Sequence, residues 1–222
     1  METGRRGAPS YDAVVAAQAE SGVQVSLGWT AGSVPLHTHA CFYYADENTL
    51  RGTLAFVRAG LDAPGEFNVI FADQSRHDSL LEWLQDGYPG DVRASLAEGK
   101  LALVPGASTR GELLAKIAAT LDGGLQRGHR LIRFLGFIAW GAPGWPDEAE
   151  LLEFESEVNA AVAAYPAVVI CTYGVPRLSG QQLIHGGLMT HPVVFLNDRV
   201  LENSPLFGDR GSANEESLRR TS

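Results

Sequence analysis

The stretch Ala167-Val168-Val169-Ile170-Cys171 is apolar at every position. A strand with one face in water alternates polar and apolar residues, whereas a strand buried on both faces does not. Strands of the second kind occur in the middle of parallel sheets that helices cover on both sides. The stretch therefore predicts a central strand, over residues 167–172, in an α/β fold.

Strand-like and helix-like patterns alternate along the chain around this stretch. The other expected strands cover residues 40–44, 67–72, 101–105, 131–139 and 193–196. The expected helices cover residues 47–60, 75–86, 109–127, 147–165 and 179–189, with a short additional one at 11–21. Such alternation is typical of a three-layer α/β sandwich with a mainly parallel central sheet.

The loops at the carboxyl edge of such a sheet are the expected place for a ligand, because they converge there. These loops follow residues 72, 105, 139 and 172. Trp140 and Trp145 flank a Gly/Pro-rich loop at one of these strand ends. Their rings are candidates for the wall of an apolar pocket, although packing in the core is the more ordinary role.

Arg133 is a charged residue inside the expected strand 131–139. A buried guanidinium without a partner is costly. We therefore expect Arg133 to form an ion pair with Glu155 or Asp73.

The composition indicates one globular domain with terminal extensions. Of the 222 residues, 45% are hydrophobic and 19% are charged, which is enough apolar material for a single core. We assign residues 1–31 to a partly disordered N-terminal extension and residues 32–207 to the domain. Residues 208–222 are expected to be a disordered tail.

The charge and the apolar pattern argue against two classes of partner. The net charge is -9 and the 17 Lys and Arg residues are scattered, which disfavours direct binding to nucleic acid. The N-terminus lacks an apolar signal segment, and no run approaches the ~18 apolar residues that span a membrane. We expect a soluble, cytoplasmic protein, in which Cys41 and Cys171 are free thiols.

Two common nucleotide-binding motifs are absent from the sequence. It contains neither G-x-x-x-x-G-K-[ST] nor a G-x-G-x-x-G after an expected strand, so we expect no standard ATP site. It also lacks G-x-S-x-G, which disfavours an ordinary α/β-hydrolase.

Residues 37–44, with the sequence HTHACFYY, concentrate reactive groups. Imidazoles and thiolates bind zinc, copper and haem iron, and they also act as bases and nucleophiles. In a strand, His37, His39 and Cys41 would share one face, which makes them candidate metal ligands. A metal would need further ligands, and the non-local candidates are His191 and Cys171. Haem or a metal ion therefore stays open as a cofactor.

Several short motifs occur in a fixed order along the chain. Val34-Pro35 and the residues up to Tyr44 form the pattern V-P-x-x-x-H-x-C-x-x-Y. The later motifs are Phe56–Leu61 with Glu66, Glu98–Leu101, Arg133, Phe154-Glu155 with Val158-Asn159, Cys171-Thr172-Tyr173, Thr190-His191-Pro192 and Glu202-Asn203. The ordered set resembles the MEDS domain, a sensory domain named for methanogens, methylotrophs and the repressor DcmR. The resemblance covers residues 32–207.

The resemblance implies a degenerate RecA/KaiC-like fold that has lost its phosphate-binding loop, with residues 37–44 in the region of that loop. It also implies a stand-alone signal-input domain, because the residues outside 32–207 are too few for an output domain. Two positions depart from the family pattern. His37 stands where many relatives have Gly, and Phe137 stands where relatives tend to carry an acid. Both departures favour binding over turnover.

We therefore expect a sensor of a small apolar or redox-active ligand that regulates a separate protein in transcriptional, anti-sigma or kinase signalling. The expected ligand-binding residues are His39, Cys41, Tyr44, Asp73, Cys171, Tyr173 and His191. Two alternatives stay open. One is an enzyme with Cys41 as nucleophile and His39 or His191 as base, and the other is a non-catalytic scaffold that forms homo-oligomers.

Overall fold

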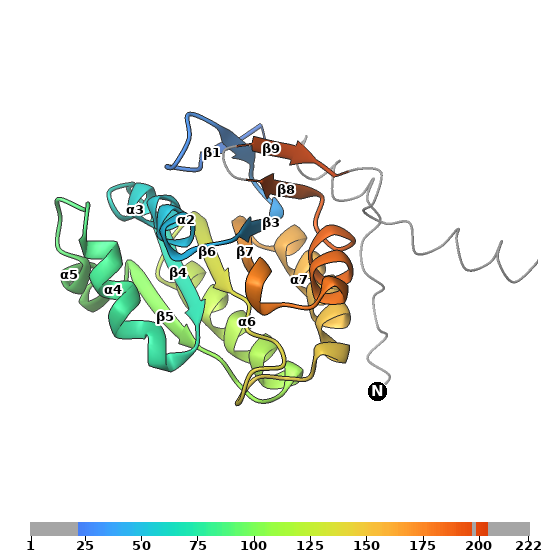
Figure 1. Cartoon of the computed structure of the whole chain (residues 1–222). Helices are drawn as coiled ribbons and strands as arrows, with labels where there is room; N and C mark the ends of the chain where they lie inside the picture. The colour runs from blue at the N-terminus through green and yellow to red at the C-terminus, as the bar shows by residue number, and fades with distance from the viewer. Residues whose placement is uncertain (1–21, 197–198, 204–222) are drawn as a thin grey trace, which may run out of the picture.

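The computed structural model describes residues 22–196 and 199–203 (Figure 1). The helix expected at residues 11–21 and the tail expected at 208–222 lie outside these ranges. Part of the expected N-terminal extension is described and is ordered into a strand. This strand, β1 (Gln24–Ser26), pairs with β2 (Ser33–Pro35) in a separate two-stranded antiparallel sheet.

A seven-stranded sheet with the order β5-β4-β6-β7-β3-β8-β9 forms the centre of the fold. Its strands are β3 (His39–Tyr44), β4 (Glu66–Ala72), β5 (Leu101–Pro105), β6 (Leu131–Phe137), β7 (Ala167–Gly174), β8 (Val193–Leu196) and β9 (Arg199–Glu202). Neighbouring strands are parallel except for the antiparallel pair β8 and β9. Strand β7 lies between β6 and β3 and is buried at every position, which confirms the predicted central strand.

Helices cover both faces of this sheet, so the fold has three layers (Figure 1). The helices are α2 (Glu47–Gly52), α3 (Leu54–Leu61), α4 (His77–Gln85), α5 (Val92–Ala97), α6 (Arg110–Gln126) and α7 (Leu151–Ala164). Short 3-10 turns form η1 (Gln74–Arg76), η2 (Glu148–Glu150) and η3 (Val175–Arg177), and η4 (Gln182–Leu188) is a π-helix. The predicted three-layer α/β sandwich with a mainly parallel sheet is confirmed.

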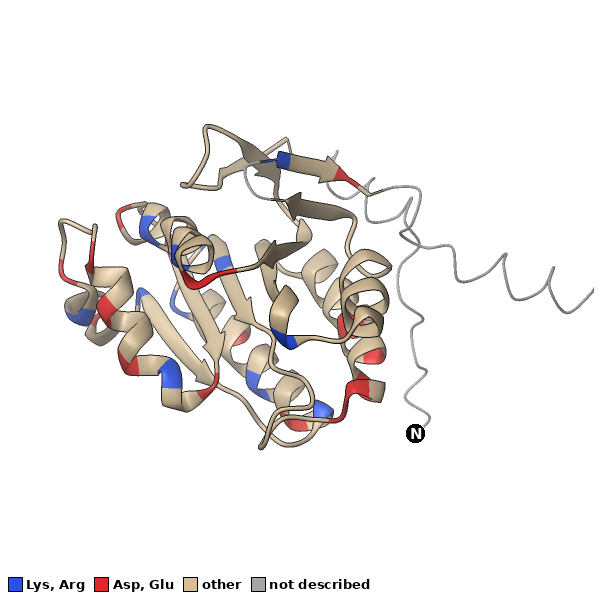
Figure 2. Ribbon diagram, viewed as in Figure 1, with Lys and Arg blue, Asp and Glu red and all other residues tan. Residues whose placement is uncertain are grey.

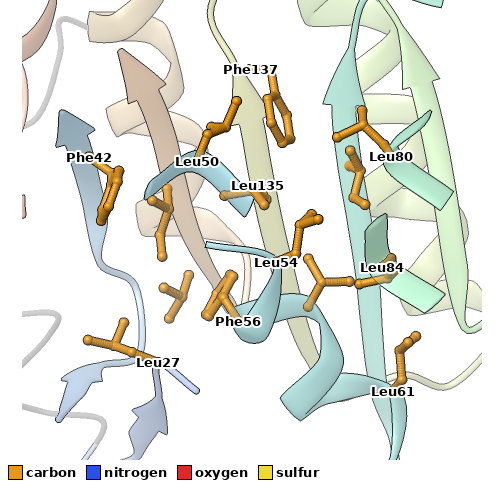
Figure 3. Packing of buried hydrophobic residues seen from close by; sticks show 14 of the residues in the cluster. Leu27, Phe42, Leu50, Leu54, Phe56, Leu61, Leu80, Leu84, Leu135 and Phe137 are labelled. Carbon is orange, nitrogen blue, oxygen red and sulfur yellow. The ribbon is translucent and has the colours of Figure 1, made fainter. Parts of the chain in front are cut away.

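The alternation of side chains along β7 divides the core into two parts. Val168 and Ile170 belong to the part that α2, α3 and α4 cover, where Leu54 and Leu84 pack toward the sheet (Figure 3). Val169 and the other odd-numbered residues of β7 belong to the part that α6 and α7 cover. On β7 and on its neighbour β3, the odd or even number of a residue therefore determines which of the two helical layers its side chain faces.

The structure differs from the expected elements in a few places. Residues 47–60 form two helices, because the N–H and the hydroxyl of Thr53 both bond to the carbonyl of Leu50, at 3.0 and 2.7 Å, and tighten the chain there. Residues 179–189 contain the π-helix η4 in place of an α-helix. The unexpected elements β1, β2, α5 and β9 are three to six residues long, too short for a periodic pattern to reveal.

Arg133 has a different partner from the two that we expected. Its Nε bonds to Glu66 Oε2 at 2.5 Å, and its guanidinium also donates to the carbonyls of Ser26 and Phe56. The expected pair with Glu155 does not form, because Arg133 points to the α3 layer whereas Glu155 lies in the α7 layer. The ion pair thus joins β6 to β4, and the two carbonyl bonds of the guanidinium join β6 to β1 and α3.

Acidic and basic residues are interspersed along the helices, as Figure 2 shows. The last strand, β9, exposes all four of its residues and carries charge only at its two ends. Within the described residues, none of the helices has both the length and the apolar character that crossing a bilayer requires.

Candidate functional site

The seven residues that we expected to bind a ligand lie in two separate places. Five are buried in the layer between the sheet and α7, and they are His39, Cys41, Cys171, Tyr173 and His191. The other two, Tyr44 and Asp73, line a pocket at the carboxyl edge of the sheet. The expected residues therefore belong to two candidate sites, which we call the buried cluster and the edge pocket.

Strands β3 and β7 position the first half of the buried cluster. They pair in parallel with Cys41 opposite Cys171, and both thiols are free and buried. His39, two residues before Cys41, places its Nε2 at 3.4 Å from Cys171 Sγ. His191 follows η4 and brings its ring centre to 4.0 Å from that of His39. The two histidines, 152 positions apart in sequence, are thus in contact with each other.

Glu155, which we expected as a partner of Arg133, completes the cluster. It lies on α7 with 0% exposure. Its Oε1 accepts a hydrogen bond from the hydroxyl of Tyr173 at 2.5 Å. Its Oε2 lies 3.4 Å from His39 Nε2 and 3.7 Å from His191 Nε2. The signal in the sequence was an acid on the apolar face of a helix, within the motif that pairs Phe154-Glu155 with Asn159.

Hydrogen bonds on the far side of each imidazole fix how the two histidines are oriented. His39 Nδ1 lies 3.0 Å from Asn159 Oδ1, and Asn159 Nδ2 donates to the carbonyl of Thr190 at 2.6 Å. The amide oxygen of Asn159 therefore faces His39 and accepts from Nδ1–H. His191 Nδ1 lies 2.8 Å from the carbonyl of Gly187, which can only accept. Each Nε2 is thereby left with a lone pair that points into the cluster.

Burial keeps the groups of the cluster uncharged near neutral pH. Loss of water lowers the pKa of His39 from 6.5 to about 4, although its bond to Asn159 raises it in part. The same loss raises the pKa of Glu155 from 4.5 to about 8, despite the bonds from Tyr173 and Cys171 that lower it. Burial first, and then the nearby His39, holds the pKa of His191 well below its ordinary value. Burial, followed by the charge of Glu155, raises the pKa of Cys171 well above its usual range.

His37 does not belong to this cluster. We expected His37, His39 and Cys41 to share one strand face, but β3 begins only at His39. The backbone of His37 is left-handed, with a φ of 66°, so the two-residue alternation of a strand doesn't extend to it. Its Nδ1 lies 3.1 Å from the carbonyl of Val162, at the end of α7. His37 is therefore removed from the candidate metal ligands, on geometric grounds.

The edge pocket has a volume of about 580 Å³ and opens where β3, β4, β6 and β7 end. Three of the four expected loops line it, those after residues 72, 139 and 172, while the loop after β5 packs through Gly106 against the ring of Trp145. Its aromatic wall is formed by Tyr44, Phe137, Trp140 and Trp145. Its charged groups are Asp73, Arg76, Glu148 and Arg177.

Comparison with known proteins places this geometry in a family. The chain matches the MEDS family, described as the methanogen/methylotroph, DcmR sensory domain, over residues 38–192. The chain belongs to the MEDS family. Among solved structures, a KaiC-like protein from the hyperthermophilic archaeon Pyrococcus horikoshii is similar to it, with a TM-score of 0.60 and 18% sequence identity. The similarity covers 78% of this chain and 80% of that one. No curated protein matches the sequence.

Both comparisons confirm predictions from the sequence. The MEDS assignment confirms the resemblance, and the KaiC-like neighbour shares the RecA-like fold. Four motifs of the MEDS resemblance supply the buried cluster, because β3, α7, β7 and the segment after η4 each bring one of them to the same point. These motifs contain His39, Glu155, Cys171 and His191.

The connection from β3 to α2 in this MEDS domain contains only Ala45 and Asp46. A phosphate-binding loop would need several glycines and a lysine between strand and helix. Here the carboxylate of Asp46 accepts from the N–H of Thr49 at 2.8 Å and caps the helix. A carboxylate at this place repels a phosphate, so the connection is not built for a nucleotide. The reactive part of residues 37–44 lies earlier, in the middle of β3, and only Tyr44 reaches the edge.

Proposed function

We propose that this MEDS domain is a signal-input domain that binds a small organic ligand in the edge pocket and reports its presence to a separate regulatory protein. The edge pocket is the observation that carries the proposal. Its volume of about 580 Å³ falls within the range of small-molecule sites. It also lies at the carboxyl ends of parallel strands, where ligands of such sheets bind.

The lining of the pocket favours a ligand with an apolar body and an anionic group. Trp140 and Trp145 offer flat apolar surfaces. The indole N–H of Trp140 is buried and has no hydrogen-bond partner among the described residues. Arg76 and Arg177 line this pocket and the smaller hollow beside it, and guanidinium groups bind carboxylates well.

The segment η4 offers a route from the pocket to the surface. Gln182, its first residue, lines the pocket and donates to the carbonyl of Trp140 at 3.2 Å. The next residue, Leu183, accepts a hydrogen bond from the hydroxyl of Tyr43. Ile184 then exposes 51% of its surface, so this segment presents an apolar side chain to solvent. A ligand that moves Gln182 would move this apolar contact point for a partner.

The anionic aromatic probe 8-anilinonaphthalene-1-sulfonate tests the proposal by its fluorescence. We expect one probe to bind per chain and to accept energy from the pocket tryptophans. Ala139→Trp fills the pocket from its wall and should weaken binding at least tenfold. Ala97→Trp, on the exposed end of α5, is the matched control and should leave binding unchanged. Equal binding by the wild type and Ala139→Trp would overturn the site.

The burial of Cys41 argues against the enzyme alternative, in which this residue is the nucleophile. Cys41 has 0% exposure, and burial raises the pKa of its thiol far above the usual range. A nucleophilic cysteine needs a stabilised thiolate and access to substrate. The geometry therefore favours binding over a Cys41-dependent reaction.

A further inference from the structure

The ring nitrogen Nε2 of His191 is buried and has no hydrogen-bond partner among the residues that the structure describes. His191 has 0% exposure, so water does not satisfy this nitrogen from outside. Glu155 Oε2 lies 3.7 Å from it, beyond hydrogen-bond range. A buried polar atom without a partner is costly, and in a native protein it calls for an explanation, of which a bound ion is one.

Four different ligand-type atoms surround this point. His39 Nε2, His191 Nε2, Cys171 Sγ and a Glu155 oxygen all lie within 4.8 Å of one another. The separations are 3.4 Å for His39 Nε2 to Glu155 Oε2, 3.4 Å for His39 Nε2 to Cys171 Sγ, and 3.8 Å for Cys171 Sγ to Glu155 Oε2. The edges of a zinc tetrahedron, worked from its bond lengths, are about 3.4 Å between N and O and about 3.6 Å between sulfur and either. These three separations match the edges of a coordination shell, and His191 Nε2 lies 3.7 Å from Glu155 Oε2 and within 4.8 Å of the other two atoms.

We propose that His39, Glu155, Cys171 and His191 bind one divalent transition-metal ion, with zinc as the best fit. Two imidazoles, a thiolate and a carboxylate are a ligand set that zinc accepts in a closed tetrahedral site. The proposal does not depend on the edge pocket or on the signalling role.

Hydrogen bonds from neighbouring groups orient the side chains of His39, His191 and Glu155 for metal binding. His39 and His191 both donate their Nδ1–H to an oxygen, of Asn159 and of Gly187 respectively. This leaves both Nε2 lone pairs free for the ion, the arrangement that metal-bound histidines usually show. Tyr173 holds one oxygen of Glu155, so the other oxygen is available as a single ligand atom.

The charges of the site also balance. The thiolate of Cys171 and the carboxylate of Glu155 carry two negative charges, which neutralise a divalent cation, while both imidazoles stay neutral. A neutral assembly is the one that a dry interior tolerates best. The ligands are 0–3% exposed, so the ion has no open position for a substrate. The site therefore holds β3, β7, α7 and the segment after η4 together.

Cobalt(II) is the probe that reports this geometry directly. Because the site is closed, the full chain should be unfolded with a chelator, then refolded with cobalt(II) and, separately, with zinc(II). We expect one metal per chain, the visible bands of four-coordinate cobalt, and a near-ultraviolet thiolate charge-transfer band. Zinc should displace cobalt and remove these bands.

Two matched variants assign the thiolate. Cys171→Ala should lose the charge-transfer band and weaken metal binding at least 100-fold. Cys41→Ala removes an equally buried thiol on the neighbouring strand and should keep both. Loss of the band in Cys41→Ala alone would overturn the ligand set. In the wild type, which needs no substitution to be tested, a refolded and soluble chain with less than a tenth of an equivalent of either metal would overturn the site altogether.

Discussion

Replacing Glu155 with Gln should remove a large pH dependence from the stability of the metal-free protein. Glutamine has the shape of a protonated glutamate and keeps an oxygen for Tyr173 and an N–H for the lone pair of His39. If Glu155 is protonated in the folded chain, the substitution therefore changes little at low pH. Its effect should appear only where the unfolded chain has released the proton that the folded chain still holds.

The size of the effect follows from the pKa of Glu155, which burial raises from 4.5 to about 8. The stability that this group contributes is complete below pH 4.5 and is lost as the pH rises toward 8. Each pH unit in that window costs about 1.4 kcal/mol, so the wild type should lose about 2.7 kcal/mol relative to Glu155→Gln between pH 5.5 and 7.5. The pKa of His39 falls from 6.5 to about 4 on folding, which adds stability as the pH rises toward 6.5, but this contribution is common to both proteins and cancels in their difference.

Urea unfolding of both proteins at pH 5.5, 6.5 and 7.5, each refolded with a chelator, measures the difference. Every other titrating group is common to the two chains, so the difference between their profiles reports Glu155. Parallel profiles would show that the folded chain retains no extra proton on Glu155 or on the groups around it, so that Glu155 is ionised without a protonated partner. The description of the cluster as uncharged would then be wrong.

Three further predictions concern stability and reactivity. Gly111→Ala, in α6 with no atom within 4 Å of the new methyl group, should stabilise the protein by about 0.5–1 kcal/mol. Gly60→Ala, whose methyl would lie 2.6 Å from Arg133 Cδ, should instead destabilise it by about 1–3 kcal/mol. The urea unfolding midpoints of the two variants and the wild type measure both effects. Arg133→Met leaves Glu66 and two carbonyls unpaired and should cost about 3 kcal/mol, and a loss under 1 kcal/mol by the same assay would show the ion pair to be unimportant. Cys41 should react with a thiol reagent at least 100-fold more slowly in the native than in the urea-unfolded chain, and rapid native labelling at this position by mass spectrometry would contradict its burial.

The fold was predictable because its longest elements carry strong patterns. The uninterrupted apolar run of β7 indicated a strand with helices on both faces, and the structure shows every one of its residues buried. The break at Thr53 was not predictable, because the apolar period continues across it from Leu50 to Phe56. The strand β9 was missed since all four of its residues are exposed, and a strand without a buried face has no alternating pattern to detect.

The site was predictable in its residue types but not in its grouping. Cys171 and His191, named from the sequence as non-local candidates for further metal ligands, do lie against His39 in the structure. Glu155 was assigned to Arg133 instead, since the sequence does not show which face of the sheet α7 covers. Asp73 was grouped with the histidines because all of them were expected to line one site at the carboxyl edge of the sheet. Only the structure shows that the histidines lie deeper, within the layer, and not at the edge.

The two candidate sites meet at η4, and this contact has a thermodynamic consequence. Gln182 at its start lines the edge pocket, while the carbonyls of Gly186 and Gly187 near its end accept from Tyr173 and His191 in the buried cluster. We expect a ligand that shifts η4 to alter metal affinity, and a metal then alters ligand affinity by the same factor, because coupling between two binding equilibria is reciprocal. Titrating 8-anilinonaphthalene-1-sulfonate into zinc-loaded and metal-free protein gives one factor, and competing zinc with a chelator with and without the probe gives the other. Equal factors of about 5 or more would establish η4 as a coupling segment, whereas a factor of one in both directions would make the buried cluster a purely structural support.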